Sequence, residues 1–399
     1  MSRKVVIISD EGAQYIEKGQ ANMYRNNLEH VAGNPQSGEI VTIETKDHHY
    51  LATGFYHETS HVVVRILTRN KEDVINDAFF KNRLQAAYDF RRTVEARNLS
   101  NCRLVFGEAD FLPGLTVDRY NDILVTQITS VGMENRKDML YKQLKQILKK
   151  DRQQIKAIYE RNDVKAREKE DLPLYKGFYD DVDLPTVITI KENGLLLNVD
   201  IENGQKTGYF LDQKSNRVLL REMAHGKTVL DCFTHTGGFA LNAAKGNAKH
   251  VTAVNVSKTA LDEALENAKL NKLEDKIDFV QADVFDYLDQ IKLHQFDIIV
   301  LDPPAFTKSR SSFYKAYNGY KHINKKAMNV LRGGGYLISC SCSHFMDREN
   351  YEKMLREAAS EAGVILKQVS VTQQNHDHPI LWTNDQETAY LKFYIFQII

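Results

Sequence analysis

Cysteine and long hydrophobic runs are scarce in this chain, which has four cysteines among 399 residues. The cysteines have neither CxxC nor other metal-ligand spacing, which argues against a disulfide scaffold and against a zinc site. No apolar run opens the sequence and no stretch of about 18 apolar residues occurs, so we expect neither a secretory signal nor a membrane span. The sequence therefore predicts a cytoplasmic protein without a bound metal.

An excess of charge of one sign is lacking too, because 53 Lys and Arg residues balance 53 Asp and Glu residues. Global electrostatics thus give no argument for a polyanionic partner, and any nucleic-acid surface must be local. The 42% hydrophobic and 27% charged residues are typical of a globular protein, and the length allows two or three domains. No fixed-period repeat is evident, which sets solenoid folds aside.

Three parts with different patterns follow one another along the chain. Residues 1–72 contain short β-like runs between glycine-containing turns, which predicts a small β-rich domain and is compatible with a homodimer. Residues 73–185 mix helical and strand-like segments and form the predicted central α+β domain. It ends in a charged stretch, residues 161–185, that indicates an irregular connection or a loose hairpin.

The third part, residues 186–399, alternates strand-like and helix-like segments, which is typical of an α/β fold with a mostly parallel sheet. Strands are predicted at residues 228–233, 250–256, 277–282, 296–301, 336–342, 364–372 and 389–398. We expect a Rossmann-like, doubly wound sheet of these seven strands. In such sheets ligands bind at the carboxyl ends of the strands.

A carboxylate and a thiol stand at the ends of two of these strands. Residues 301–306 (LDPPAF) and 338–343 (ISCSCS) each follow an apolar run, so Asp302 and Cys342 are expected to face the same crevice. Alternation along the strand puts Cys340 on the same side as Cys342. Since Cys342 comes last, we expect it to be exposed to the crevice and Cys340 to lie in the core.

The first crossover of the sheet, residues 230–239 (LDCFTHTGGF), has an acid at the strand end and two glycines where a helix begins. Glycine lets a ligand approach the backbone, but the GxGxxG spacing of a dinucleotide site is missing, which disfavours a dehydrogenase. The loop resembles the first motif of class I S-adenosylmethionine-dependent methyltransferases. That resemblance implies cofactor contacts by Asp231, Phe233, Gly237 and Gly238. The alternative is a tight turn without a ligand.

The same resemblance implies cofactor contacts at the next two strand ends. Methyltransferases of this class usually have an acid after the second strand for the ribose hydroxyls, whereas this chain has Asn255, which cannot form a charge-assisted pair. Asp283, with Val284 beside it, stands where the family contacts the adenine amine. A surface aspartate is the alternative for Asp283.

The residues after Asp302 favour methylation of carbon over nitrogen. Pro303 and Pro304 cannot continue a strand, so they form a rigid turn that presents the carboxylate. Amino-group methyltransferases have an aromatic residue directly after the prolines, but here Phe306 comes one position later. Cytosine C5 becomes nucleophilic only after a thiolate adds at C6, and Cys342 is the candidate nucleophile. A buried, inert cysteine is the alternative.

A locally basic stretch joins the two candidate catalytic residues. Residues 303–346 contain no Asp or Glu, and their cations alternate with aromatic rings. Basic residues and aromatic rings together are typical of surfaces that bind unpaired nucleic acid. We therefore predict RNA contacts here; a solvated helix with buried rings is the alternative. The residues concerned are Lys308, Arg310, Lys315, Lys321, Lys325, Lys326, Arg332, Phe306, Phe313, Tyr314, Tyr317 and Tyr320.

Motifs along nearly the whole chain resemble the PUA-domain-containing bacterial large-subunit rRNA cytosine-C5 methyltransferases. They are residues 107–108 (GE), 112–119 (LPGLTVDR), 206–213 (KTGYFLDQ), 236–239 (TGGF), 302–304 (DPP), 341–343 (SCS) and 377–379 (DHP). Residues 1–72 take the place of the RNA-binding PUA domain. Residues 19–24 (GQANMY) replace the Pro-Trp pair that the family tends to carry there.

The resemblance implies a cofactor, a substrate and a mechanism. S-adenosylmethionine would be held by Phe210, Asp212 and Gln213 together with the glycine loop, and the substrate would be large-subunit (23S) rRNA or a ribosomal precursor. Cys342 would add to cytosine C6 while Asp302 binds the base edge. His378 would close the pocket or, as we prefer, cap a turn.

Many RNA cytosine-C5 enzymes have a second cysteine in the motif at Asp302, and this chain has none there. Two other functions stay open. One is an RNA methyltransferase acting on a guanine or adenine nitrogen, with Cys342 as a bystander. The other is an rRNA-binding assembly factor without turnover, which Asn255 suggests.

Overall fold

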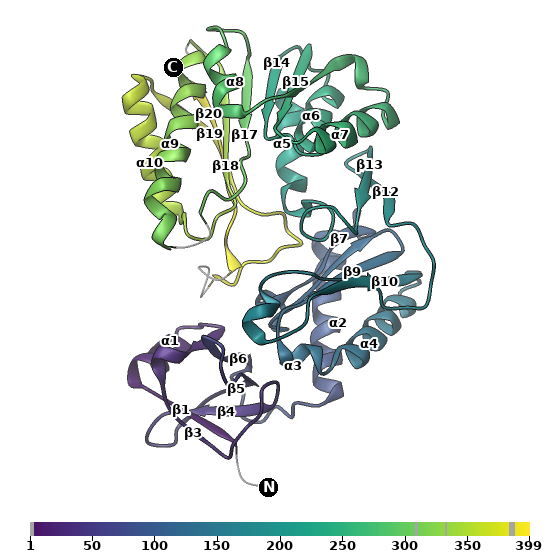
Figure 1. The fold of residues 1–399 in the computed structure, drawn as a ribbon, viewed down its shortest axis with the longest axis vertical. Coiled ribbons are helices and arrows are strands. Elements are labelled where there is room, and N and C mark those ends of the chain that lie inside the picture. Colours follow the sequence, from purple (N-terminus) through teal and green to yellow (C-terminus); the bar gives the residue numbers. More distant parts are fainter. Residues whose placement is uncertain (1–3, 308–309, 332, 383–387) are drawn as a thin grey trace. The chain divides into compact units, whose positions relative to one another are not determined.

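The computed structural model describes residues 4–307, 310–331, 333–382 and 388–399 (Figure 1). The chain forms two compact units, each assembled from separate stretches of sequence. The first unit combines Met1–Ile190, Val199–Leu211 and His376–Thr388, and the second combines Lys191–Asn198, Asp212–Asn375 and Ala389–Ile399. The domain boundaries predicted after residues 72 and 185 stay predictions, because the two units follow packing and not order along the chain.

A six-stranded sheet forms the N-terminal part of the first unit, with strand order β2-β6-β5-β4-β1-β3. Its strands are β1 (Val5–Ile8), β2 (Asn22–Tyr24), β3 (Leu28–Ala32), β4 (Ile40–Glu44), β5 (Tyr50–Tyr56) and β6 (Val62–Thr68), and helix α1 (Asp10–Glu17) follows β1. Val6 and Ile8 alternate along β1 and share a core with Ile16 of α1. The β-rich N-terminal part is therefore confirmed.

The central part of the first unit is a five-stranded sheet with order β11-β10-β9-β8-β7. It consists of β7 (Asn101–Phe106), β8 (Leu115–Tyr120), β9 (Ile123–Ile128), β10 (Ala157–Asn162) and β11 (Tyr175–Phe178), with helices α2 (Asp77–Val94), α3 (Val131–Glu134) and α4 (Lys137–Lys150). Helix α2 begins where the Asn76 side chain accepts a hydrogen bond from the Phe79 N–H. Its residues Phe80, Leu84 and Tyr88, four apart, form one apolar stripe in the core.

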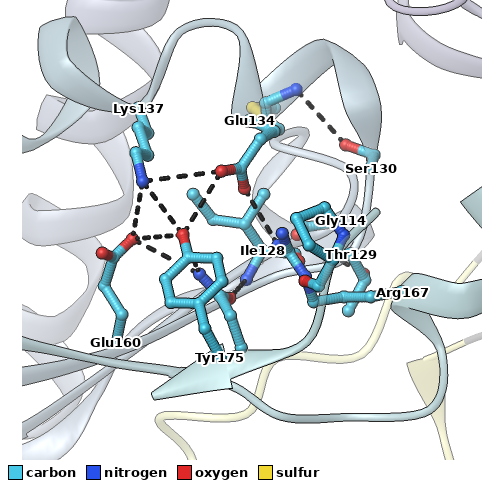
Figure 2. Close-up of polar contacts among 12 residues, drawn as sticks. Gly114, Ile128, Thr129, Ser130, Glu134, Lys137, Glu160, Arg167 and Tyr175 are labelled. Atoms are coloured by element: carbon cyan, nitrogen blue, oxygen red, sulfur yellow. Dashed lines mark hydrogen bonds and ion pairs between the residues drawn. The ribbon is translucent and has the colours of Figure 1, made fainter. Parts of the chain in front are cut away.

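A polar network attaches the charged stretch after β10 to this central sheet (Figure 2). Strand β11 pairs antiparallel with β10, so part of the stretch 161–185, predicted to be an irregular connection or a loose hairpin, forms a hairpin. The Tyr175 hydroxyl lies 2.9 Å from Lys137 Nζ and 3.0 Å from Glu160 Oε1. Buried Arg167 donates to the Ile128 carbonyl at 2.6 Å and to Glu134 Oε2 at 2.9 Å. The buried charges of this network are therefore paired, as a low-dielectric interior requires.

Two later segments of the chain return to the first unit. In the segment His376–Thr388, the Asp377 carbonyl accepts a hydrogen bond from Arg91 Nη2 at 3.0 Å, and Asp377 Oδ2 accepts one from the Arg103 N–H at 3.0 Å. In the segment Val199–Leu211, Thr207 Oγ1 donates to Asp118 Oδ2 at 2.5 Å. Buried hydrogen bonds thus anchor both segments to the first unit.

The second unit contains a seven-stranded sheet with order β16-β15-β14-β17-β18-β20-β19. Its strands are β14 (Thr228–Cys232), β15 (His250–Asn255), β16 (Ile277–Gln281), β17 (Ile298–Leu301), β18 (Tyr336–Ser341), β19 (Leu366–Thr372) and β20 (Lys392–Ile398). All neighbours are parallel except β20, which is antiparallel to β18 and β19. The predicted seven-stranded sheet is confirmed.

Helices cover both faces of this sheet (Figure 1). On one face lie α5 (Lys214–Met223), α6 (Gly238–Lys245) and α7 (Lys258–Leu270), and on the other α8 (Val284–Gln290), α9 (Phe313–Val330) and α10 (Arg348–Ala362). Strands β12 (Val187–Glu192) and β13 (Leu195–Asp200) form a two-stranded sheet. Asn193 and Gly194 between them have φ of 50° and 77°, as a tight hairpin turn requires. Among the described residues, no helix is long and apolar enough to cross a membrane.

Candidate active site

The loop after β14 is held in a conformation that costs free energy. Phe233 and His235 have φ of 62° and 53°, in the left-handed region, where a residue with a side chain loses roughly 1–2 kcal/mol. Gly237 has φ of 85°, and a Cβ added there would lie 3.2 Å from Ala264 Cβ. The turn therefore needs its glycine, and strained loops of this kind cluster at ligand sites. Gly238 follows as the first residue of α6.

Asp231, one residue before the end of β14, is fully buried beneath this loop. Its Oδ2 accepts hydrogen bonds from Thr234 Oγ1 at 2.6 Å and from the Ala240 N–H at 2.9 Å. Its Oδ1 has no hydrogen-bond partner within the described part of the chain. Burial raises the pKa of Asp231 to about 7, against the opposing effect of the two hydrogen bonds. A buried carboxylate with one unsatisfied oxygen suits a ligand that brings an ammonium group.

Asp212 and Gln213 end a short 3-10 helix, η4 (Leu211–Gln213), before α5. Asp212 Oδ2 accepts a hydrogen bond from the Tyr390 hydroxyl at 2.6 Å. Gln213 Nε2 donates to Asp302 Oδ2 at 3.1 Å, and Gln213 Oε1 accepts from Asn216 Nδ2 at 2.7 Å. Sequence reasoning predicted Gln213 as a cofactor contact and missed its hydrogen bond to the candidate catalytic carboxylate.

The strand ends of β15 and β16 position the other predicted cofactor residues. Asn255 is the last residue of β15, and its carbonyl accepts from the Ala282 N–H at 3.2 Å. Asp283 caps α8, since its Oδ1 accepts from the Phe285 N–H at 2.8 Å. Val284 is buried. One oxygen of Asp283 is therefore used within the protein, and the predicted contacts of all three residues with a cofactor stay predictions.

Asp302 and Cys342 come directly after the ends of adjacent strands β17 and β18. Cys340 is buried within β18, as predicted, while Cys342 is half-buried. Burial raises the pKa of the Tyr320 hydroxyl to about 12, and the negative charges of Cys342 and Asp302 add to this rise. The carboxylate and the thiol therefore both act electrostatically on the same buried phenol.

The prolines and the ring after Asp302 differ in burial and contacts. Pro303 is buried and Pro304 is exposed. The Phe306 ring lies 4.6 Å from that of Tyr320 and 6.1 Å from that of Phe285, measured between centroids. Phe306 is thus half-buried among other aromatic rings, and its predicted contact with a base stays a prediction.

Residues 303–346 contain no acidic residue, but acidic side chains from other helices lie beside their lysines. Lys321 Nζ lies 2.9 Å from Glu361 Oε1, and Lys325 Nζ lies 3.0 Å from Glu361 Oε2. Both ion pairs join α9 to α10. Lys326 pairs with Asp289 of α8 at 2.5 Å. These ion pairs offset the positive charge of α9, which favours the alternative of a solvated helix with buried rings at these positions.

Other parts of the basic stretch differ from α9. Tyr320 is buried, but the Tyr314 side chain is 80% exposed and available to a partner. Lys308 and the side chain of Arg310, both predicted RNA contacts, lie outside what the structure describes. RNA binding by this stretch therefore stays a prediction.

Phe210 and His378 belong to the first unit. Lys206 Nζ lies 4.8 Å from the centroid of the Phe210 ring. His378 Nδ1 lies 2.7 Å from Asp377 Oδ1, and its ring lies 5.3 Å from that of Phe106. These contacts agree with a structural role for His378, and the cofactor role of Phe210 stays a prediction.

Sequence reasoning also missed Lys392, the first residue of β20. It is 7% exposed, and its Nζ donates to the Ser343 carbonyl at 2.6 Å and to the Tyr390 carbonyl at 2.7 Å. The signal was a lysine at the fourth position of the otherwise apolar run 389–395. From the sequence alone, such a lysine would be assigned to an exposed edge strand. The fold shows instead that its strand lies inside the sheet.

The fold and the glycine loop define a class I methyltransferase. Residues 180–392 match the model of the family described as S-adenosylmethionine-dependent methyltransferase, and residues 6–69 match that of a PUA-like domain. The chain belongs to this family of S-adenosylmethionine-dependent methyltransferases with a PUA-like domain. S-adenosylmethionine, the predicted cofactor, is thereby confirmed, and the unsatisfied oxygen of Asp231 fits its ammonium group.

Among its relatives are proteins called ribosomal RNA large subunit methyltransferase I. The protein of that name from Yersinia pseudotuberculosis serotype O:1b is 38% identical over 376 residues, which is 93% of each chain. That from Yersinia pestis bv. Antiqua (strain Angola) is 38% identical over 358 residues, 89% of each. The predicted family resemblance is thus confirmed.

Solved structures agree with the fold. A protein from Streptococcus mutans assigned as a SAM-dependent methyltransferase superposes with a TM-score of 0.82 at 21% identity, covering 98% of this chain and 99% of that one. SMU.776, assigned as a methyltransferase and solved as a complex with SAH, has a TM-score of 0.83 at 21% identity and full coverage of both chains.

Proposed function

We propose that this protein methylates C5 of a cytosine in large-subunit rRNA through a covalent adduct with Cys342. The observation that carries the proposal is the pair Asp302 and Cys342, each one residue past the end of the adjacent parallel strands β17 and β18. The substrate follows from the relatives that share 38% of residues over 93% of the chain and are named for methylating large-subunit ribosomal RNA.

The chain's own groups account for cofactor binding. S-adenosylmethionine, when bound, supplies an electrophilic methyl group. Asp231 offers Oδ1 to the ammonium group of the cofactor, and Gly237 lets the cofactor approach the backbone. Asn255 and Asp283, at the next two strand ends, would contact ribose and adenine.

The covalent route follows from the two strand-end residues. The thiolate of Cys342 adds to C6, a C–S bond forms, and the electron pair of the C5–C6 double bond becomes available at C5. Asp302 hydrogen-bonds the cytosine edge and promotes protonation at N3. C5 would then take the methyl group from the sulfonium, whose S–CH₃ bond breaks to leave S-adenosylhomocysteine. A base would remove the C5 proton, and the C–S bond to Cys342 would break to release the thiolate.

Binding of the RNA would involve Pro303, Pro304, Phe306, Lys308, Arg310 and Lys321, together with the PUA-like domain. Of these, the ion-paired Lys321 is the weakest candidate, because its charge is already offset by Glu361. A substrate of this kind implies action in the cytoplasm, and a homodimer stays a prediction.

The test is incubation with S-adenosylmethionine and unmodified large-subunit rRNA, followed by nuclease digestion and mass spectrometry of the nucleosides. New 5-methylcytidine that is absent with Cys342→Ala supports the proposal. A methylated guanine or adenine formed equally by the variant would mean a nitrogen methyltransferase. RNA binding without any methylated nucleoside would favour an assembly factor.

A further inference from the structure

Lys392 is a buried cation beside the candidate nucleophile. In the pairing of β18 with β20, Lys392 lies opposite Ser341, the residue before Cys342. Its Nζ donates to the carbonyl of Ser343, the residue after Cys342, at 2.6 Å. The lysine therefore fixes the backbone on both sides of the thiol and holds its ammonium group at this end of β18.

Lys392 forms no ion pair with any described residue. Its two acceptors are neutral carbonyls, and no carboxylate lies within 4.0 Å of its Nζ in the described part of the chain. Burying an unpaired ammonium costs several kcal/mol, and burial lowers the pKa of Lys392 to about 8. Negative charge on Cys342 or Asp347 opposes that shift. A lysine retained here at such a cost needs a compensating anion.

The other titratable groups near the pair form no ion pair with Lys392 in the described part of the chain. Asp347 caps α10, accepting the Asn350 N–H at 2.8 Å and Asn350 Nδ2 at 2.9 Å. Burial keeps the pKa of Cys340 far above its usual range, so that thiol is neutral. His344 lies against the Tyr390 ring, with centroids 5.5 Å apart, and carries at most positive charge.

Two further carboxylates, those of Asp212 and Asp302, remain to be considered. Asp212, from η4, is hydrogen-bonded to the Tyr390 hydroxyl at 2.6 Å. Asp302 follows β17, the strand beside β18, and its negative charge acts on the same Tyr320 hydroxyl as that of Cys342. Negative charge near a thiol disfavours its thiolate, and a nearby cation offsets that effect.

We propose that Lys392 is the positioning residue that stabilises the thiolate of Cys342 and orients its backbone for attack on the base. The proton of the Cys342 thiol leaves to solvent before the adduct forms, and Lys392 keeps its own proton at neutral pH. This role rests on the proposed function, since it assigns a cation to the nucleophile of that mechanism. Lys392 lies outside the basic stretch of residues 303–346, so its proposed role does not depend on RNA binding by that stretch.

The test measures thiolate formation directly, without RNA. The full-length protein is alkylated with iodoacetamide between pH 6 and 10, and mass spectrometry follows the Cys342 peptide; Cys102, Cys232 and Cys340 are buried and react slowly. We expect the wild-type rate to rise with an inflection below the ordinary thiol value of about 8.5. Lys392→Met should lower the rate at pH 7 about tenfold or more and move the inflection upward, while Lys392→Arg should restore most of it.

Two results would overturn this role: a wild-type inflection at or above the ordinary thiol value, or an unchanged profile in folded Lys392→Met. The first needs no variant, so the proposal stays testable if Lys392→Met does not fold. This test can fail or succeed independently of the proposed function. A low inflection without 5-methylcytidine formation would contradict only the function, and methylation with an ordinary inflection would contradict only the role of Lys392.

Discussion

Gln213 donates a hydrogen bond from Nε2 to Oδ2 of Asp302 over 3.1 Å, and Asn216 fixes the amide by donating to Gln213 Oε1 over 2.7 Å. This arrangement leaves the amide one orientation, with its NH₂ group toward the carboxylate. Gln213 therefore orients Asp302, which in the proposed mechanism binds the base edge, besides any contact that Gln213 makes with the cofactor. The two roles lead to different kinetics.

Replacing Gln213 by Leu is expected to reduce kcat for methylation roughly tenfold, because a hydrogen bond to a charged group contributes about 1.5–3 kcal/mol. The dissociation constant of S-adenosylmethionine, measured by calorimetry, should change less than kcat. Asn216→Ala, which frees the Gln213 amide without removing it, should give a smaller loss in the same direction. A large loss of cofactor affinity with unchanged kcat would assign Gln213 to the cofactor alone.

The raised pKa of Asp231 leads us to expect that cofactor binding depends on pH. Its folded-state pKa of about 7 lies above the usual value of about 3.9, so the free protein takes up a proton on folding, and this contribution to stability declines as pH rises from about 4 to 7. Binding of an ammonium group needs the ionised carboxylate. Affinity for S-adenosylmethionine should therefore rise between pH 6 and 8, by up to about tenfold per unit below the pKa.

Asp231→Asn is the matched control for that pH dependence. The variant should bind the cofactor weakly and with little change from pH 6 to 8. Its thermal stability should also lack the decline expected for the wild type between about pH 4 and 7. Calorimetric titrations at several pH values provide the measurement. An equally steep pH dependence in the variant would show that another group titrates.

The Tyr175 hydroxyl should contribute measurably to stability. It contacts Lys137 Nζ at 2.9 Å, Asn162 Nδ2 at 2.8 Å and Glu160 Oε1 at 3.0 Å (Figure 2). Tyr175→Phe leaves these partly buried groups short of a partner, so the free energy of unfolding in urea should fall by about 1–3 kcal/mol. Tyr314→Phe, at a side chain that is 80% exposed, should change it little. Equal effects of the two substitutions would contradict the importance of the network.

Tyr314 is the described ring of the basic stretch best placed to stack on an RNA base. Since stacking on an aromatic side chain contributes about 1–3 kcal/mol, Tyr314→Ala should weaken RNA binding about fivefold or more in filter-binding or fluorescence assays. Lys325→Ala removes a cation that is already paired with Glu361 and should have a smaller effect. If the lysine variant loses more affinity than the tyrosine variant, phosphate contacts along α9 dominate.

The sequence predicted those features that depend on local pattern. Alternating apolar runs indicated the seven strands, and the residues after the runs that form β17 and β18 identified Asp302 and Cys342. Contacts between distant segments could not be read in the same way. The Gln213 contact with Asp302 joins residues 89 apart, and the acids that pair with the α9 lysines come from α8 and α10. Lys392 became informative only when β20 was seen to lie between β18 and β19.

The most direct test of the account is trapping of the covalent adduct. In RNA containing 5-fluorocytidine, the C5 substituent cannot leave as a proton, so the bond between Cys342 and C6 should persist after methyl transfer. We predict a protein–RNA complex that resists denaturing electrophoresis, requires S-adenosylmethionine and is absent with Cys342→Ala. Formation of 5-methylcytidine on ordinary RNA by Cys342→Ala, with no trapped complex in the wild type, would contradict covalent catalysis by this residue.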